Sequence, residues 1–222
     1  IFSLKVEGYK VLICCFSPHK AHIISIMFPI ITRSPILITG GAGFIGSNLI
    51  KRLLDLGNNN INVTAKDSTS LSRLKSITGK IKLHKADLLD LKGLKKIFNK
   101  VNPSIIIHLA TYSAYSDQQA AFEMVEVNIN GTLNLLEASK DINYDIFINT
   151  GSSSEYGIKN KPMKENDLLE PLSFYAVTKA SATLLCQVFA KEFQKPIITL
   201  SPFSVYGPYE EKKRFIPTII KA

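Results

Sequence analysis

From residue 35 onward, short apolar runs alternate with longer stretches in which apolar residues recur at helical spacing. The short runs have the length of strands and occupy residues 35–39, 61–65, 81–85, 104–110, 145–150 and 196–201. The longer stretches, near residues 44–56, 90–99, 119–140 and 174–193, have the period and length of amphipathic helices.

Strands that are separated by helices favour right-handed crossovers and therefore a parallel sheet. The strand candidates are nearly all apolar, which is typical of a sheet that is covered on both faces. The pattern predicts an α/β fold, a Rossmann-type doubly wound parallel sheet with helices on both faces.

A glycine-rich turn joins the first predicted strand to the first predicted helix, in "ILITGGAGFIGSNL" at residues 36–49. Gly40, Gly43 and Gly46 form the pattern G-x-x-G-x-x-G. In that context the first glycine allows a tight turn, the second lets the backbone approach a pyrophosphate, and the third lets the helix pack closely on the strand. The motif predicts a dinucleotide site at the helix N-terminus. A glycine turn with a purely structural role is the alternative.

Two acidic residues follow the second and third predicted strands. Asp67 comes 21 residues after Gly46, where a carboxylate can bind the ribose hydroxyls of NAD and repel the 2′-phosphate of NADP. The nearby Lys66 and Arg73 leave NADP open, and a helix cap or turn role is the alternative for Asp67. Asp87 occupies the corresponding place after the third strand, where an N-cap role is the alternative.

A second constellation lies further along the chain. Tyr175 and Lys179 are four residues apart in a predicted helix, so their side chains share one face. A lysine ammonium beside a phenol is expected to lower the pKa of the phenol, which could then exchange a proton with a sugar hydroxyl. Ser152, Ser153 and Ser154 directly follow the fifth strand, at the edge of the sheet where α/β proteins bind ligands.

With these motifs in order, the chain from about residue 35 to 222 resembles the extended short-chain dehydrogenase/reductase family, which includes the NAD-dependent nucleotide-sugar epimerases and dehydratases. The resemblance rests on "TGGAGFIGSNL", "KDSTS", "ADLLD", "IIHLAT", "VNINGTLNLLEA", "SSSEYG", "YAVTK" and "PFSVYGP".

The resemblance implies NAD as cofactor and a nucleotide-diphosphate sugar as substrate. Tyr175 matches the catalytic acid/base, Lys179 its partner, and Ser152 the catalytic Ser/Thr, with Ser153 as the next choice. Asn128 matches a structural asparagine. The implied cofactor-binding residues are Gly40, Gly43, Phe44, Ile45, Gly46, Asp67, Asp87, Leu88, Leu109, Ala110, Tyr175 and Lys179.

Two departures from the family pattern bear on the activity. Relatives that dehydrate the sugar carry an acidic pair after the catalytic Ser/Thr, whereas this chain has Ser153 and Ser154 there, and Glu155 one step late. This favours an epimerase or 4-keto reductase that transfers hydride at the sugar C4. A 4,6-dehydratase and a non-catalytic NAD-binding protein are the alternatives. Ser201 stands where relatives often have Arg.

Charge and cysteine content narrow the remaining function classes. The formal charge is +9, but the basic residues are spread out and lack interleaved aromatics, which favours a solvated lysine-rich surface over a nucleic-acid partner. The three cysteines include no CxxC pair, which is typical of a reducing compartment. Cys14 and Cys15 lie near His19 and His22, but their spacing is not that of a zinc site, so we expect no metal.

The sequence predicts three parts. Residues 1–34 form an N-terminal extension of uncertain role, in which the apolar stretch is too interrupted to span a membrane. Residues 35–207 form the NAD-binding Rossmann domain, and residues 208–222 begin a substrate domain that is largely missing, so we expect a fragment. We expect a cytoplasmic enzyme without a membrane partner, homodimeric in its full-length form.

Overall fold

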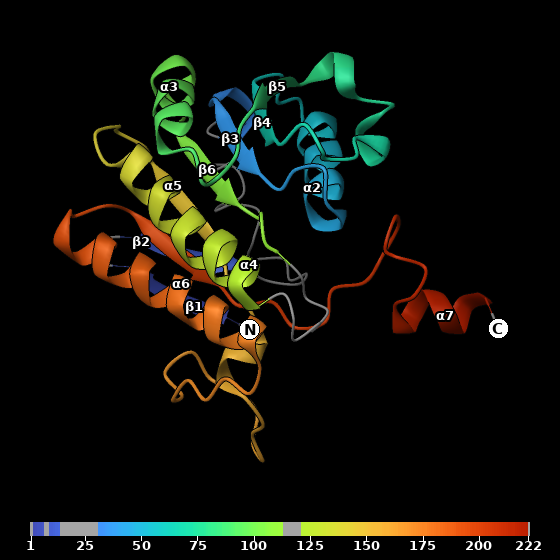
Figure 1. The fold of residues 1–222 in the computed structure, drawn as a ribbon, viewed down its shortest axis with the longest axis vertical. Helices are drawn as coiled ribbons and strands as arrows, with labels where there is room; N and C mark the ends of the chain where they lie inside the picture. The colour runs from blue at the N-terminus through green and yellow to red at the C-terminus, as the bar shows by residue number, and fades with distance from the viewer. Residues whose placement is uncertain (1, 7–8, 14–30, 113–120, 222) are drawn as a thin grey trace.

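The computed structural model describes residues 2–6, 9–13, 31–112 and 121–221 (Figure 1). Its centre is a six-stranded parallel sheet in the order β5-β4-β3-β6-β7-β8. The strands are β3 (Ile36–Thr39), β4 (Ile61–Ala65), β5 (Lys82–Lys85), β6 (Ile105–His108), β7 (Ile146–Thr150) and β8 (Ile197–Leu200). The predicted doubly wound parallel sheet is confirmed.

The helices follow the predicted stretches within a few residues. They are α2 (Phe44–Asp55), α3 (Leu91–Val101), α4 (Ala121–Val125), α5 (Gly131–Ser139), α6 (Phe174–Glu192) and α7 (Phe215–Lys221), with the 3₁₀ turns η2 (Ser72–Leu74), η3 (Thr78–Lys80) and η6 (Ser153–Tyr156). The stretch predicted near 119–140 consists of α4, a π-helical segment, η5 (Glu126–Asn130), and α5. The beginning of that stretch lies outside the described residues.

Alternating residues of β3 feed two separate cores, one on each face of the sheet. Leu37 packs in a cluster with residues of α3, α5 and α6, while Ile36 and Ile38 pack in a second cluster with residues of α2 and η2. Figure 1 shows α3, α5 and α6 together on one side of the sheet and α2 on the other. Burial of both faces explains the apolar character of β3.

The outer strands are less buried than their apolar sequences indicate. In β5 the side chain of Leu83 is 38% exposed, and three of the four positions of β8 are half-buried. β5 lies at one end of the strand order and β8 at the other, which leaves each of them paired on one side only. The expectation that the whole sheet is covered on both faces therefore holds for β3, β4 and β6 and not for β5.

The two ends of the chain contain further described segments. β1 (Phe2–Val6) pairs with β2 (Tyr9–Ile13) in an antiparallel hairpin, while Cys14, Cys15, His19 and His22 lie outside the described residues. Residues 31–34 are tied to the sheet domain because the buried Asn58 amide donates to the carbonyls of Ile31 and Ser34. Among the described residues, no helix combines the length and apolar character needed to cross a bilayer.

After β8 the chain passes over the N-terminal half of α2. The Asn48 amide donates to the carbonyl of Pro208 at 2.9 Å, and the ammonium of Lys51 lies 3.4 Å from the centre of the Tyr209 ring. Beyond this contact, α7 projects away from the sheet (Figure 1), with Phe215 75% and Ile220 78% exposed.

Candidate functional site

The candidate site lies at the carboxyl ends of the parallel strands, around β3, β6 and β7. The chain order of the strands reverses between β3 and β6, which makes this the topological switch point where open α/β sheets bind ligands. The glycine turn follows β3, Leu109 and Ala110 follow β6, and Ser152 follows β7. Segments far apart in the sequence are therefore brought to one edge of the sheet.

Close packing explains two of the three motif glycines. Gly40 has a φ of +69°, and a Cβ there would lie 2.5 Å from the backbone nitrogen of Ala110. A Cβ on Gly46 would lie 2.5 Å from the carbonyl oxygen of Gly40. A Cβ on Gly43 would meet only that same oxygen, at 3.1 Å, so the space above Gly43 is open to a ligand.

The N-terminus of α2 faces this open space with uncapped backbone donors. Gly43 is the N-cap residue, no side chain caps the helix, and its first turn carries no acidic residue. The first N–H groups of a helix have no intrahelical acceptors and lie at the positive end of its dipole. The Gly43 N–H already donates to the Gly40 carbonyl at 3.0 Å. The N–H groups of Phe44 and Ile45 therefore remain as the donors for a dinucleotide pyrophosphate, and the cradle fits this group.

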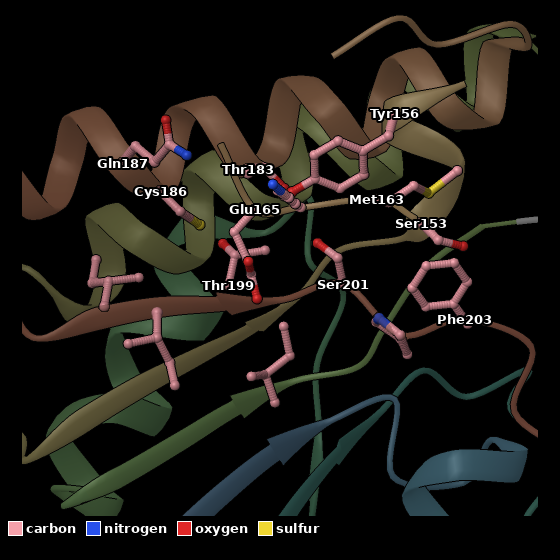
Figure 2. A pocket seen from close by; sticks show the side chains of 15 residues that line it. Ser153, Tyr156, Met163, Glu165, Thr183, Cys186, Gln187, Thr199, Ser201 and Phe203 are labelled. Atoms are coloured by element: carbon pink, nitrogen blue, oxygen red, sulfur yellow. The ribbon is translucent and has the colours of Figure 1, made fainter. Parts of the chain in front are cut away.

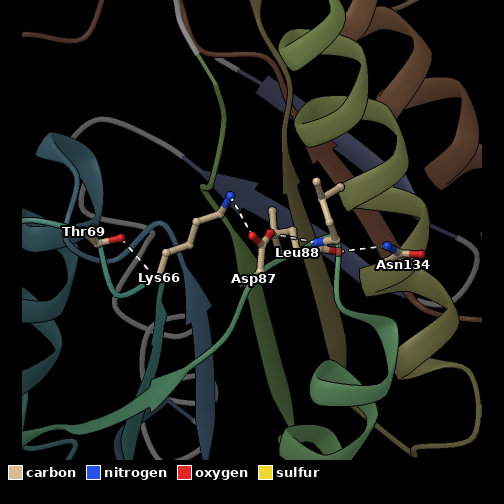
Figure 3. A network of polar contacts seen from close by, with 6 residues as sticks. Lys66, Thr69, Asp87, Leu88 and Asn134 are labelled. Atoms are coloured by element: carbon tan, nitrogen blue, oxygen red, sulfur yellow. Dashed lines mark hydrogen bonds and ion pairs between the residues drawn. The ribbon is translucent and has the colours of Figure 1, made fainter.

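Both acidic residues predicted to contact the cofactor form ion pairs with lysines. Asp87 pairs with Lys66 at 2.9 Å, and Asp67 pairs with Lys85. Figure 3 shows the Lys66–Asp87 contact in the gap between the ends of the two strands, beside Leu88. These pairs are largely exposed, so each is a weak contact that a ligand could replace.

Asp87 does not cap the following helix, so the alternative N-cap role for it is wrong. The N-cap of α3 is Asp90, whose side chain accepts from the Gly93 N–H at 3.0 Å. Burial raises the pKa of Asp87, but the Leu89 N–H and the Lys66 ammonium outweigh it and hold that pKa below its usual range. Leu88 is buried, and its carbonyl accepts from the Asn134 amide (Figure 3).

A chain of buried hydrogen bonds connects the end of β3 to helix α6. The Thr39 hydroxyl lies 2.7 Å from Nδ1 of His108, and Nε2 of His108 lies 3.0 Å from the Thr132 hydroxyl. The Thr132 hydroxyl donates to the Asn128 carbonyl at 2.6 Å, and the Asn128 amide donates to the Thr178 hydroxyl at 3.0 Å. The structural role that we predicted for Asn128 is therefore to join η5 to α6 through this hydrogen bond.

The same network sets the protonation state of His108. Since the Thr132 hydroxyl already donates to a carbonyl, it accepts from Nε2–H of His108, which leaves Nδ1 to accept from Thr39. Burial, and to a lesser extent the charge of Lys179, lower the pKa of His108 to about 3. The neutral imidazole is therefore the form that the fold contains at neutral pH.

Ser152, Tyr175 and Lys179 meet between η6 and α6. Ser152 is the N-cap residue of η6 and is 9% exposed, whereas Ser154 is exposed. The Ser152 hydroxyl lies close enough to the Tyr175 phenol to lower its pKa. Ser152, rather than the next choice Ser153, is therefore the serine that contacts the phenol.

The electrostatics of this trio differ from the expectation in one respect. Burial raises the pKa of Tyr175, and the Ser152 hydroxyl lowers it only in part. Lys179 is expected to lower this pKa, but its charge acts on Glu155, Cys186 and His108 and not on Tyr175. Burial lowers the pKa of Lys179 itself. The phenol is accordingly protonated at neutral pH.

Glu155 is a further functional candidate. The sequence showed it only as an acidic residue one position after the acidic pair of the dehydratases. The residue is fully buried. Its Oε1 accepts a hydrogen bond from the Ser152 N–H at 2.6 Å, and Ser152 Oγ accepts one from the Ser154 N–H. These two reciprocal bonds form a capping box at the start of η6. Its side chain points into the protein beneath Ser152. No pattern in the sequence distinguishes this orientation from that of an exposed loop acid.

A cavity of about 450 Å³ lies on the far side of this corner, between α6 and β8 (Figure 2). Its lining includes Ser153, Tyr156, Thr183 and Phe203, together with Ser201, the residue that replaces the family arginine. The Ser201 hydroxyl hydrogen-bonds Tyr156. None of Ser152, Tyr175 and Lys179 lines this cavity, so it adjoins the candidate site without being part of it.

Comparison with known proteins identifies the family of this chain and several relatives. The model of the NAD dependent epimerase/dehydratase family matches residues 36–222. The chain is 38% identical to protein CapI of Staphylococcus aureus over 78% of this chain and 55% of that protein. It is 32% identical to dTDP-D-glucose 4,6-dehydratase of Dictyostelium discoideum over 83% of this chain and 47% of that protein.

A solved structure of a similar protein has the same fold as this chain. The UDP-glucuronic acid 4-epimerase of Bacillus cereus, in complex with UDP-glucuronic acid and NAD, superposes with a TM-score of 0.72 at 34% identity. The match covers 84% of this chain and 62% of that one. The chain thus spans about half the length of the curated relatives that it matches.

Proposed function

The chain belongs to the NAD-dependent epimerase/dehydratase family, and we propose that it forms the NAD-binding part of an enzyme acting on nucleotide-diphosphate sugars. The observation that carries this proposal is the meeting of two motifs at one sheet edge. The open cradle above Gly43 and the neighbouring hydroxyl groups of Ser152 and Tyr175 both lie at the carboxyl ends of the strands. The first suits the cofactor, and the second suits a reacting sugar hydroxyl.

The residues have distinct roles in this proposal. A bound nicotinamide supplies the acceptor and donor of hydride. Tyr175 holds the proton at its phenol oxygen and exchanges it with the oxygen at the sugar C4, while Ser152 orients that oxygen by hydrogen bonding. Lys179 and Asp67 bind the cofactor riboses. The raised pKa of Tyr175 means that the phenol is ready to donate a proton to a 4-keto group.

Within the family, an epimerase or 4-keto reductase fits this chain better than a 4,6-dehydratase. A dehydratase needs acidic groups that reach the sugar, and Ser153 and Ser154 supply none. The nearest acid, Glu155, is fully buried and holds the Ser152 backbone. This orientation keeps its carboxylate away from any substrate beside Tyr175.

The sugar, the nucleotide and the assembly also belong to this proposal, because the chain spans only part of its relatives. A homodimer in the cytoplasm suits the family resemblance and the absence of a CxxC pair. A non-catalytic NAD-binding protein is a weaker candidate, since Ser152, Tyr175 and Lys179 are all present and Ser152 lies beside the Tyr175 phenol.

The test is a substrate screen on this chain and on any longer protein that contains it. UDP-, dTDP-, CDP- and GDP-hexoses are incubated with NAD, and the products are identified by NMR, which separates a C4 epimer from a 4-keto-6-deoxy sugar. From a longer protein we expect C4 epimerisation or 4-keto reduction that disappears in Tyr175→Phe, whereas this chain by itself is expected to bind NAD with little sugar turnover. A 4-keto-6-deoxy product would contradict the argument from Glu155, and NAD binding by a longer protein without turnover of any sugar would support the non-catalytic protein.

A further inference from the structure

The carboxylate of Glu155 makes one strong contact and leaves one oxygen without a good hydrogen bond. Oε1 accepts the Ser152 N–H at 2.6 Å, whereas the buried Oε2 lies near the Thr183 hydroxyl without a hydrogen bond of good geometry. The preceding loop is shaped around this group, because a Cβ on Gly151 would lie 2.6 Å from Oε1. A buried carboxylate is costly unless an opposite charge balances it.

The positive charge that acts on Glu155 comes from α6, although burial outweighs it and raises the pKa of the Glu155 carboxyl. Lys179 is 5% exposed, and the groups whose charges act on it are Glu155 and Cys186. Burial raises the pKa of Cys186 to about 12, so its thiol is neutral at physiological pH. Among the described residues this leaves Glu155 as the partner that balances the ammonium of Lys179.

We propose that Glu155 is a positioning residue of the catalytic site: its carboxylate holds the Ser152 backbone in place and keeps the buried ammonium of Lys179 charged. The proposal rests on the proposed function, because it assigns Ser152 and Lys179 to the reaction. One side chain thereby couples the loop after β7 to the helix that carries Tyr175. It does so from inside the protein, because its side chain is fully buried and is not placed to contact substrate or cofactor.

The surroundings of Glu155 determine how the proposal can be tested by pH. The titratable groups whose charges act on it or are affected by it are Lys179, Cys186, Tyr156 and Tyr175. Of these groups, only Lys179 can be positively charged. The ionisation of Lys179 is therefore the direct reporter of the Glu155 charge.

The experiment measures the ionisation of Lys179 in this chain, without substrate. A proton–nitrogen correlation spectrum of the lysine ammonium groups is recorded against pH, and the Lys179 signal is assigned by its loss in Lys179→Met. In Glu155→Gln the amide can still accept from Ser152, but the negative charge is gone. We expect the pKa of Lys179 to fall by at least about one unit, a tenfold change in its protonation equilibrium.

Glu165→Gln is the matched control. Glu165 is exposed, and its charge acts on Tyr156 rather than on Lys179. The control removes the same charge from the same region, so the pKa of Lys179 should stay at its parent value. An unchanged Lys179 pKa in Glu155→Gln, or an equal fall in both variants, would overturn the proposal.

A reciprocal measurement covers the case in which Glu155→Gln does not fold. Coupling between two ionisable groups is mutual, so Lys179→Met should raise the pKa of the Glu155 carboxyl by a similar amount. That pKa is followed through the carbon-13 signal of the carboxyl group. A Glu155 pKa that does not respond to the loss of Lys179 would overturn the proposal independently.

Turnover provides the last readout in any protein for which the sugar screen is positive. Glu155→Gln should lower kcat at least tenfold while KM and NAD affinity change less than about threefold, and the pH limb that depends on Lys179 should move to lower pH. A variant with the parent kcat and pH profile would refute the positioning role. If the parent turns over no sugar, the proposed function fails while the NMR result still decides the Glu155–Lys179 coupling.

Discussion

Replacement of His108 by Gln should make the stability of this protein less sensitive to acid. The folded protein holds the His108 pKa at about 3, whereas an unfolded imidazole has its ordinary value of 6.5. A histidine with a depressed folded pKa contributes its full stability above the unfolded pKa, and this stability is lost as pH falls from about 6.5 towards 3. His108→Gln removes this titration because the amide carries no charge at any pH in that range.

The size of the effect follows from the two pKa values. Each pKa unit corresponds to about 1.4 kcal/mol, so a folded protein that excludes the proton loses about 2 kcal/mol at pH 5 relative to neutral pH. The hydrogen bonds explain why the proton is excluded, since a charged imidazole would need Thr39 to accept at Nδ1 instead of donating. Burial adds the cost of desolvating the charge.

The assay is urea unfolding at about pH 7.5 and about pH 5 for the parent and His108→Gln. The variant is expected to be less stable at both values, because an amide fills the imidazole site poorly, but its loss between the two values should be smaller by about 2 kcal/mol. His84→Gln is the control, since His84 is only half-buried and its pKa is lowered less far. Equal losses in the parent and His108→Gln would refute the reasoning.

Three further outcomes are expected. Titrations should show tighter binding of NAD than of NADP, and Asp67→Ala should narrow the difference at least about tenfold, because Lys85 loses its partner and becomes available to a 2′-phosphate. Gly46→Ala should lower the free energy of unfolding in urea by about 1–3 kcal/mol and weaken NAD binding, because its Cβ would lie 2.5 Å from a backbone oxygen. Gly79→Ala is the control and should change neither quantity, because no atom lies within 4 Å of the added Cβ. Tyr175→Phe should lower turnover by about 10²–10⁴-fold with NAD affinity nearly unchanged, and a parent-like rate would exclude the phenol as proton carrier.

The sequence was sufficient for the architecture because the evidence for it is local. Apolar runs of strand length, helical periodicity and a glycine turn at a strand–helix junction each depend on neighbouring residues, and together they require a parallel sheet. The carboxyl ends of such strands lie at one edge, so the approximate site of Ser152 and of the glycine turn also followed. The choice of Ser152 over Ser153 followed from alignment with the family motif.

The electrostatic detail could not be predicted in the same way, because it depends on contacts across the sheet. Lys85 reaches Asp67 since β5 pairs in parallel with β4, with Lys85 opposite Ala65. Lys179 was expected to act on Tyr175 from their spacing on one helix, but the structure brings it to Glu155, on a turn 24 positions earlier. Periodicity shows which residues share a face and does not show what that face meets.

The buried polar chain from Thr39 to Thr178 explains how two distant motifs keep a fixed relation. Hydrophobic packing is non-directional and tolerates small slippage between elements, whereas the hydrogen bonds from Thr39 through His108 and Thr132 to Asn128 each require one geometry. Asn128 lies in the π-helical segment η5, and such segments recur at functional sites. Its amide contacts both the loop after β6, at Tyr112, and helix α6, at Thr178. The glycine turn that suits the cofactor and the helix that carries Tyr175 are therefore held in register by polar groups inside the core. The proposed function requires this register, because hydride would be exchanged at the sugar C4 and the proton at the oxygen bonded to it.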